Sequence, residues 1–120
     1  MPYHSHMIYL FGIPNCDTVK KARTYLETRS IPFEFVDFKK SPPTVESIVL
    51  WQKAFGGLPV NIKGQTYKKH AAEYEALSEK DQIDFICKNF SMIKRPVLQK
   101  DKTVLNFGFD EKEFKKKLGR

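Results

Sequence analysis

Residues 8–17 of this 120-residue chain are Ile8-Tyr9-Leu10-Phe11-Gly12-Ile13-Pro14-Asn15-Cys16-Asp17, and they set its architecture. The first four form a continuous apolar run, which is typical of a strand buried on both faces. Gly12-Ile13-Pro14-Asn15 ends this run with a turn signal, and a helix is predicted to begin at Asp17. Cys16 is therefore expected in the turn, at or beside the start of the helix.

The predicted helix leads into a second predicted strand. Its apolar face consists of Val19, Ala22, Tyr25 and Leu26, which recur at helical spacing. Ser30-Ile31-Pro32 ends the helix, and the alternating residues Phe33–Phe38 predict the strand. A strand, a helix and a strand within about 30 residues form a βαβ unit, so the two strands are expected to lie parallel.

The middle of the chain is expected to be mostly helical. A helix opening at Ser41-Pro42-Pro43-Thr44 and closing at Phe55-Gly56-Gly57 presents the face Val45, Ile48, Val49 and Gln52. Residues 58–72 have no clear period and predict a loop. A capped start at Ser78-Glu79-Lys80-Asp81 predicts a further helix with the apolar stripe Ile83, Ile86, Cys87 and Phe90.

The last part of the chain predicts a hairpin and a helix. Residues 97–99 and 103–107 read as two strands around a turn, and Asp110 caps a helix over 111–118. The whole order predicts an α/β protein with a thioredoxin-like fold, βαβ…ββα, in which a mixed sheet carries a helical insertion. We expect one domain over residues 7–118.

Residues 1–6 are left out of this prediction, as a flexible terminus that is either native or a cloning remnant. They contain His4 and His6, which have no third ligand beside them. No metal site is therefore expected.

Composition and charge narrow the class of protein. Hydrophobic residues make up 41% and charged residues 29%, and no apolar run reaches the roughly 18 residues of a membrane span. Collagen-like, transmembrane and low-complexity proteins are thereby excluded. The formal charge of +7 favours an anionic partner, although a merely basic surface would explain it equally well. Two cysteines are too few for a disulfide scaffold and suit a reducing, cytoplasmic location.

Cys16 is the leading candidate for a catalytic residue. The start of a helix offers unpaired N–H groups and the positive end of the helix dipole, and both favour a thiolate. Lys20 and Lys21, about one turn further on, add positive charge, whereas the neighbouring Asp17 opposes it. We expect the favourable effects to prevail, so Cys16 is predicted to be a nucleophile rather than an inert buried cysteine.

The second thiol is expected to be structural. Cys87 lies on an apolar helical stripe and is predicted to be a small core residue. Val19 stands three residues after Cys16, so the chain has no CxxC pair. A thiol that resolves a mixed disulfide on Cys16 would come from outside, and glutathione or glutaredoxin would serve.

Arg95-Pro96 precedes a predicted strand. Thioredoxin-like folds place a cis proline beside the active cysteine at this point, so Arg95 is expected to project toward Cys16. Its planar guanidinium would then offer a fork of donors to an oxyanion or a carboxylate. The alternative is an ordinary surface arginine. Lys63 is a weaker candidate for the same pocket, because loop lysines are usually solvated.

Four segments together resemble the arsenate reductase (ArsC)/Spx family, most closely its short YffB-type branch. They are Gly12–Ala22, Asn61–Tyr67, Ile93–Leu98 and Phe107–Glu111. The resemblance spans residues 7–118 and implies one nucleophilic cysteine, Cys16, in a thioredoxin-like domain. It also implies a pocket for substrate or glutathione, made by Asn15, Asp17, Thr18, Lys63, Arg95 and Pro96.

In the arsenate reductases of this family, the cysteine attacks arsenate, glutathione displaces the arsenic, and glutaredoxin regenerates the thiol. Three arginines hold the oxyanion there. Arg95 matches one, Lys63 stands where another is frequent, and the third region reads Asn106-Phe107-Gly108. The resemblance therefore implies a glutathione- or glutaredoxin-dependent reductase whose Cys16 forms a mixed disulfide with glutathione. Arsenate is a further candidate substrate, and no bound cofactor is expected.

The alternative from another class is an Spx-like regulator that binds RNA polymerase without catalysis. The redox switch of that group uses a CxxC pair, which Cys16 and Val19 do not form. A thioredoxin-like binding module without turnover is a third possibility. Direct nucleic-acid binding is not expected, because the lysines are scattered and no aromatic–basic motif is present.

Overall fold

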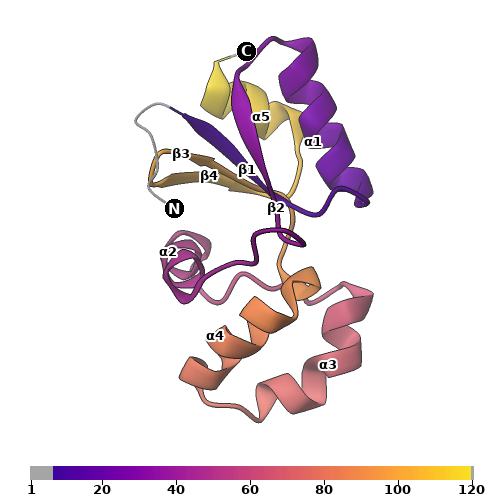
Figure 1. The fold of residues 1–120 in the computed structure, drawn as a ribbon, viewed down its shortest axis with the longest axis vertical. Helices are drawn as coiled ribbons and strands as arrows, with labels where there is room; N and C mark the ends of the chain where they lie inside the picture. The colour runs from indigo at the N-terminus through magenta and orange to yellow at the C-terminus, as the bar shows by residue number, and fades with distance from the viewer. Residues whose placement is uncertain (1–6, 120) are drawn as a thin grey trace. The chain divides into compact units, whose positions relative to one another are not determined.

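The structure is a computed structural model, and it describes residues 7–119. Its elements are β1 (Ile8–Gly12), α1 (Asp17–Thr28), β2 (Phe33–Asp37), α2 (Val45–Phe55), α3 (Gln65–Glu75), α4 (Glu79–Lys88), a 3-10 turn (Phe90–Met92), β3 (Val97–Lys100), β4 (Thr103–Phe107) and α5 (Glu111–Leu118) (Figure 1). The chain divides into a sheet unit, residues 7–40 and 95–119, and a helical unit, residues 41–94. His4 and His6 lie outside the described residues.

The strands form one mixed sheet in the order β2-β1-β3-β4. β1 and β2 are parallel, as the βαβ pattern predicts, whereas β3 pairs antiparallel with both β1 and β4. The predicted thioredoxin-like architecture is therefore confirmed. In the register of the central pair, Leu10 lies opposite Leu98 and Phe11 lies opposite Val97. This register brings the start of β3 next to the end of β1.

Helices α1 and α5 supply the core on one face of the sheet. The predicted stripe of α1 is confirmed, since Val19, Ala22, Tyr25 and Leu26 are all buried. The cluster in which α1 and α5 meet the sheet consists of Ile8, Leu10, Ala22, Tyr25, Leu26, Ile31, Leu98 and Phe114. The rings of Tyr25 and Phe114 meet edge to face, with their centroids 5.6 Å apart. The two helices are thus joined to each other as well as to the sheet.

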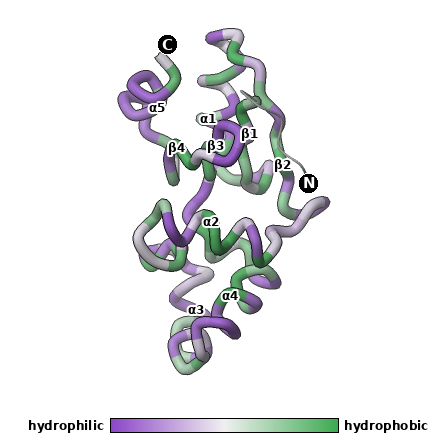
Figure 2. The backbone as a smooth tube through the Cα atoms, turned by 90° about the vertical axis from the view of Figure 1, so that its left-hand side faces the viewer, coloured by the Kyte–Doolittle hydropathy of each residue, from purple (hydrophilic) through white to green (hydrophobic). Residues whose placement is uncertain are grey.

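The last helix is hydrophilic along most of its length, as Figure 2 shows. Asp110 caps it as predicted, because its carboxylate accepts hydrogen bonds from the N–H groups of Lys112 and Glu113 at 2.9 and 3.3 Å. Phe114 is the buried residue of this helix, with Leu118 half-buried beside the same core. Phe114 and Leu118 therefore attach α5 to the core of the sheet unit.

In the helical unit, α2 has the predicted bounds but a different inner face. Thr44 caps it by accepting a hydrogen bond from the Ser47 N–H, and Gly56 ends it in the left-handed conformation. Ile48 and Trp51 are buried, whereas Val45, predicted to face inward, is 48% exposed. The indole of Trp51 determines which face of α2 is buried, because it carries far more apolar surface than a valine in the first turn.

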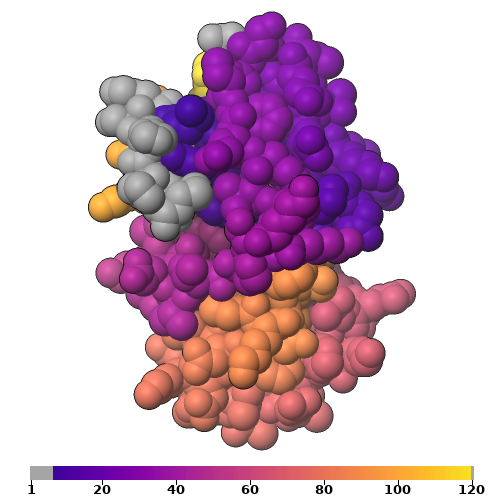
Figure 3. All heavy atoms as spheres, viewed as in Figure 1, coloured from indigo at the N-terminus to yellow at the C-terminus, as the bar shows by residue number. Residues whose placement is uncertain are grey.

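The prediction of a loop over residues 58–72 is wrong for most of the segment, because α3 begins at Gln65. Its contacts are made by aromatic side chains. Tyr74 packs edge to face on Tyr67, and Phe85 of α4 lies against both Tyr74 and His70. Figure 3 shows α3 and α4 side by side in pink and orange. Tyrosine and histidine carry half-polar side chains, so their helical period is weak in hydropathy.

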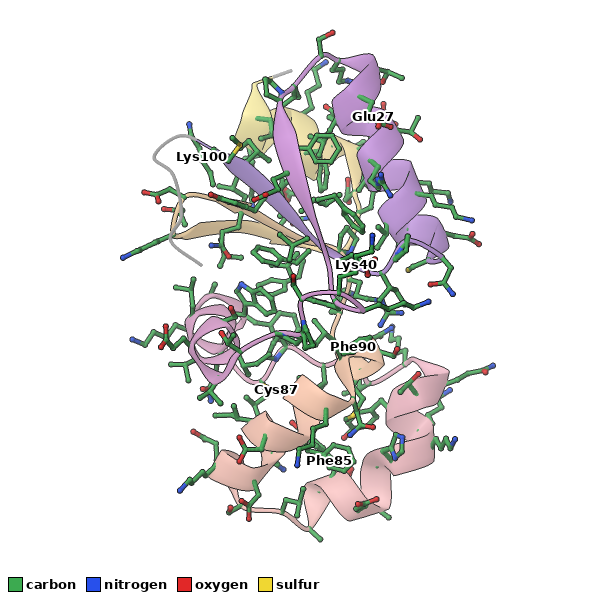
Figure 4. The ribbon with its side chains drawn as sticks, in the orientation of Figure 1. Glu27, Lys40, Phe85, Cys87, Phe90 and Lys100 are labelled. Carbon is green, nitrogen blue, oxygen red and sulfur yellow. The ribbon has the colours of Figure 1, made fainter. Side chains whose placement is uncertain are left out.

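Helix α4 confirms the predicted start and buries Ile83 and Ile86. It ends at Lys88, however, and Phe90 opens the 3-10 turn instead of continuing the helix. Cys87 lies on α4 between Phe85 and Phe90, as labelled in Figure 4, and is half-buried rather than fully enclosed. Within residues 7–119, no helix is long and apolar enough to span a bilayer.

Candidate active site

Cys16 is the N-cap residue of α1, as its place in the sequence predicts. Its backbone is extended, with φ −112° and ψ 128°, and its carbonyl accepts the Lys20 N–H at 2.9 Å, which closes the first turn of the helix. The preceding strand is anchored where the Gly12 carbonyl accepts the Phe38 N–H at 2.8 Å. The thiol is thus held between the end of β1 and the start of α1.

Thr18 links this thiol to a segment that is distant in the sequence. Its Oγ1 lies 3.1 Å from the Cys16 Sγ, and either atom can be the donor. The same hydroxyl lies 3.4 Å from the carbonyl oxygen of Arg95, 77 residues further along the chain, to which it can donate. One hydroxyl therefore connects the start of α1 with the segment that enters β3.

Arg95 reaches Cys16 because of the strand register. β3 runs antiparallel to β1 and begins opposite Phe11, so the residues just before β3 lie beside the turn that carries the thiol. The Arg95-Pro96 peptide bond is cis, as expected for this layout. The Arg95 side chain is half-buried and hydrogen-bonds to the Cys16 sulfur. The expectation that Arg95 projects toward Cys16 is therefore confirmed.

These neighbours stabilise the charged form of the thiol. Burial alone raises the pKa of Cys16, but it is outweighed by hydrogen bonds from the Thr18 hydroxyl, the Val19 N–H and the Arg95 side chain, together with the charge of Arg95. The pKa consequently lies below the ordinary value for a cysteine. The sulfur makes no standard capping hydrogen bond to α1, so the Val19 N–H acts on it with looser geometry.

The source of this stabilisation differs from the one predicted. Among the residues that the structure describes, Thr18, Val19 and Arg95 act on the Cys16 thiol, rather than Lys20, Lys21 or Asp17. The side chains of Lys20, Lys21 and Asp17 are exposed, so water screens their charges. The charges nearest to Cys16 in the sequence therefore affect its thiol less than Arg95 does, which comes from a distant part of the chain within the sheet unit.

Cys87 has the opposite character. Burial raises its pKa, and the negative charge of Asp84 raises it further. It also lies in the helical unit, on α4, whereas Cys16 belongs to the sheet unit. The surroundings therefore shift the two thiols in opposite directions, Cys16 toward the thiolate and Cys87 toward the protonated form.

The other predicted pocket residues fall into two groups. Asn15 and Asp17 are exposed on either side of Cys16, and Pro96 is buried directly after Arg95. Lys63 belongs to the helical unit, where it is exposed in the turn before α3. Its part in the Cys16 site stays a prediction, as do the substrate contacts of Asn15, Asp17, Thr18 and Pro96.

Sequence reasoning missed one residue that supports the site. Gly12 is buried in the last position of β1, and it also lies against the side chain of Val19. The available signal was a glycine directly after an apolar run, which the prediction used only as a turn marker. A close approach between strand and helix is the second common reason for such a glycine.

Together, these side chains can support nucleophilic chemistry. A thiolate is the reactive form of cysteine, and the guanidinium beside it can attract an anion to the same place. A sulfur atom in a disulfide or the central atom of an oxyanion are both suitable electrophiles for such a group.

Comparison with known proteins identifies the family of the fold and the site. The ArsC family model matches residues 11–117. A global transcriptional regulator Spx from Streptococcus pyogenes serotype M3 is 29% identical over 117 residues, covering 95% of this chain and 87% of the relative.

Two solved structures are similar over nearly their whole length. The YFFB protein is 30% identical with a TM-score of 0.76, covering 93% of this chain and 99% of the other. An arsenate reductase (ArsC) related protein from Brucella melitensis is 29% identical with a TM-score of 0.70, covering 98% of both chains.

Proposed function

Because this chain belongs to the ArsC family, we propose that it is a thiol-dependent reductase with Cys16 as the nucleophile and glutathione as co-substrate. The observation that carries the proposal is the environment of Cys16, where Thr18 and Arg95 favour the thiolate. A reaction of this kind takes its electrons from thiols, so no bound cofactor is required. It also needs a reducing compartment such as the cytoplasm.

In the first step, the Cys16 thiolate attacks one sulfur of a glutathione disulfide or of a glutathionylated substrate. A new S–S bond forms between Cys16 and glutathione, the old S–S bond breaks, and the departing thiolate takes a proton from water. In the second step, an external thiolate attacks the glutathione sulfur of this mixed disulfide. The external thiol leaves oxidised, as a disulfide with glutathione, and Cys16 returns as a thiolate.

The second thiol is proposed to be external because Cys16 has no CxxC partner and the surroundings of Cys87 disfavour its thiolate. Val19 stands at the position where a CxxC motif would have its second cysteine. Cys87 lies in the helical unit and has a raised pKa, caused by burial and by Asp84. Glutathione itself or a glutaredoxin is therefore the proposed reductant of the mixed disulfide.

Arg95 is proposed to bind a carboxylate of glutathione while it stabilises the thiolate. Its guanidinium presents a planar fork that matches a carboxylate in geometry as well as charge. Lys63 would supply a second positive charge, and the net charge of +7 favours the approach of an anionic tripeptide.

Arsenate is the less favoured substrate. Within residues 7–119, Arg95 is the arginine that acts on the thiol, and a lysine at position 63 cannot offer a bidentate contact. In the region expected to hold a further arginine, Asn106 uses its side-chain amide to donate to the Gly108 carbonyl at 3.0 Å. The Asn106 amide is thus partly engaged within its own segment, and it carries no positive charge to offer an oxyanion.

A second candidate function rests on the Spx relatives. Their similarity covers 95% of this chain, so a role as a regulator that binds RNA polymerase has a specific observation in its favour. Affinity purification of the tagged protein from its own cells distinguishes the two. A regulator retains polymerase subunits and shows no reductase turnover, whereas the proposed enzyme turns over with Cys16 intact.

The direct test is mass spectrometry of the reduced protein after exposure to glutathione disulfide. We expect one glutathione adduct, located on the peptide that contains Cys16. Cys87→Ser should form the same adduct at the same rate, and Cys16→Ser should form none. An adduct confined to Cys87, or no adduct on either thiol, would refute the proposed reaction.

A further inference from the structure

The hydroxyl of Thr18 stands between two groups that compete for its single proton. Cys16 Sγ lies 3.1 Å away and the Arg95 carbonyl oxygen 3.4 Å away. Thr18 is the second residue of α1 and its side chain is exposed, so the hydroxyl can rotate between these two directions. A hydroxyl donates one hydrogen bond but can accept others.

The state of the sulfur decides which direction is favoured. A thiolate is a charged acceptor, and hydrogen bonds to charged groups are stronger than neutral ones. The Thr18 proton should therefore point to sulfur when Cys16 is ionised. When Cys16 is a thiol, its S–H can donate to the Thr18 oxygen, and the hydroxyl proton is then available to the Arg95 carbonyl. A disulfide on Cys16 removes the charge and leaves the same preference for the carbonyl.

We propose that Thr18 is a positioning residue whose hydroxyl switches its hydrogen bond between the Cys16 sulfur and the Arg95 carbonyl as the sulfur loses or gains charge. The inference rests on the proposed function in one respect, that Cys16 is the nucleophile. It gives Thr18 a role in addition to the predicted contact with substrate. In the proposed reaction, the hydroxyl would stabilise Cys16 each time the sulfur leaves a mixed disulfide as a thiolate.

The switch links the thiol to the segment that enters β3. Arg95 contributes two groups to it, a guanidinium that faces the sulfur and a carbonyl that faces Thr18. Ionisation of Cys16 strengthens the first contact and weakens the second. Asp17 and Lys20 are the charged residues within one turn of Cys16 on α1, and both side chains are exposed. Arg95, the main charged partner of the sulfur, is therefore also the residue whose carbonyl loses the Thr18 hydrogen bond when Cys16 ionises.

The first measurement compares the pH dependence of Cys16 alkylation by iodoacetamide in the intact protein and in Thr18→Val, which keeps the shape but removes the hydroxyl. The rate reports the thiolate fraction. At pH 7 we expect alkylation to slow by roughly tenfold, the lower end of the effect expected for one hydrogen bond to a charged group. Thr18→Ser should restore the rate. Thr24→Val, an exposed threonine on the same helix, is the matched control and should change nothing.

The second measurement follows the Arg95 carbonyl directly. Arg95-Pro96 is the one Arg-Pro pair in the sequence, so labelling arginine carbonyls with ¹³C and proline nitrogens with ¹⁵N gives a single carbonyl–nitrogen correlation. In the intact protein this signal should move with pH in parallel with the ionisation of Cys16. In Thr18→Val most of that movement should be lost, although the thiol still ionises, and Thr18→Ser should recover it.

Two results would overturn the inference. Thr18→Val could leave the alkylation profile unchanged, which would mean that the hydroxyl does not stabilise the thiolate. Alternatively, the Arg95 signal could move just as far without the hydroxyl, which would mean that no switch connects them. Neither measurement requires turnover. Failure of the proposed reductase activity would therefore leave this test intact, and failure of this test would leave the glutathione adduct to be judged separately.

Discussion

A methyl group placed on Gly12 would lie 2.7 Å from the Cγ2 atom of Val19, because the end of β1 and the first turn of α1 are in close contact. Val19 is fully buried, and its N–H is one of the donors that favour the Cys16 thiolate. The β-branched side chain of valine has few rotamers with which to avoid such a methyl group. The absence of a side chain at Gly12 therefore permits the close approach of Val19, whose N–H acts on the thiol.

Gly12→Ala should weaken both the fold and the site. Moving Val19 disturbs the core, with an expected cost of about 1–3 kcal/mol in the free energy of unfolding. It should also displace the Val19 N–H and raise the pKa of Cys16. Chemical denaturation and the pH profile of Cys16 alkylation measure the two effects. Gly57→Ala is the matched control, because nothing lies within 4 Å of a methyl group there. Equal behaviour of the two variants would contradict the role of Gly12.

Replacing Arg95 should separate the effect of charge from that of geometry. Arg95→Ala removes both and should slow Cys16 alkylation at neutral pH by about fivefold or more. Arg95→Lys retains the charge without the planar fork, so it should recover the alkylation rate in part but bind glutathione substrates more weakly, seen as a higher KM. Arg23→Ala removes a positive charge elsewhere on α1 and is the control. If Arg95→Lys matches the intact protein in both measurements, the fork has no role.

The stability of the protein should depend on pH through Cys16. Against the opposing effect of burial, hydrogen bonds and the charge of Arg95 lower the pKa of Cys16 in the folded chain relative to an ordinary thiol, so folding shifts this group toward the thiolate. The resulting stabilisation is complete above the pKa of the unfolded chain and is lost as pH falls through the folded pKa. The free energy of unfolding of the intact protein, minus that of Cys16→Ser, should therefore rise as the pH increases from below the folded pKa of Cys16 to above its unfolded pKa. Cys87 is present in both proteins, so its opposite contribution cancels. A flat or falling difference would contradict a stabilised thiolate.

Lys63 tests whether the turn before α3 takes part in substrate binding. Lys63→Ala should raise the KM for a glutathionylated substrate by several-fold, while the alkylation rate of Cys16 stays unchanged. Lys63→Arg should restore or improve binding, because arginine adds a bidentate contact. Lys68→Ala, which removes an exposed charge from α3 itself, is the control for net charge. An unchanged KM in Lys63→Ala would exclude this lysine from the pocket.

The sequence predicted those parts of the fold that depend on strong local patterns. The apolar run of β1, the stripe of α1 and the turn between β3 and β4 combine hydrophobic period with clear turn residues, and each is where it was expected. α3 was not predicted because its packing uses Tyr67, His70 and Tyr74, whose polar atoms lower their hydropathy although their rings offer apolar surface. Local hydropathy does not register that kind of contact.

The site was predictable in outline but not in its hydrogen bonds. The position of Cys16 at a helix start follows from neighbouring residues, and the general order of elements indicates that Arg95 lies near it. The contact of Thr18 with the Arg95 carbonyl depends on the register of β1 and β3, which is set by packing between residues far apart in the chain. Electrostatic effects followed these contacts rather than the nearest charges in sequence.

The division of the sheet unit into two pieces of chain has a consequence for the order in which the protein is made. A ribosome synthesises Cys16 and the whole helical unit before it reaches Arg95, and β1 can pair with β2 but not yet with β3. Until residue 95 emerges and β3 docks, the nascent chain lacks the guanidinium that favours the thiolate, as well as the carbonyl that holds Thr18. A chain truncated anywhere in the helical unit should therefore carry a sluggish thiol. The complete set of groups that stabilise the thiolate is therefore present only after translation has passed the insertion, so the reactivity of Cys16 would report that the sheet unit is complete.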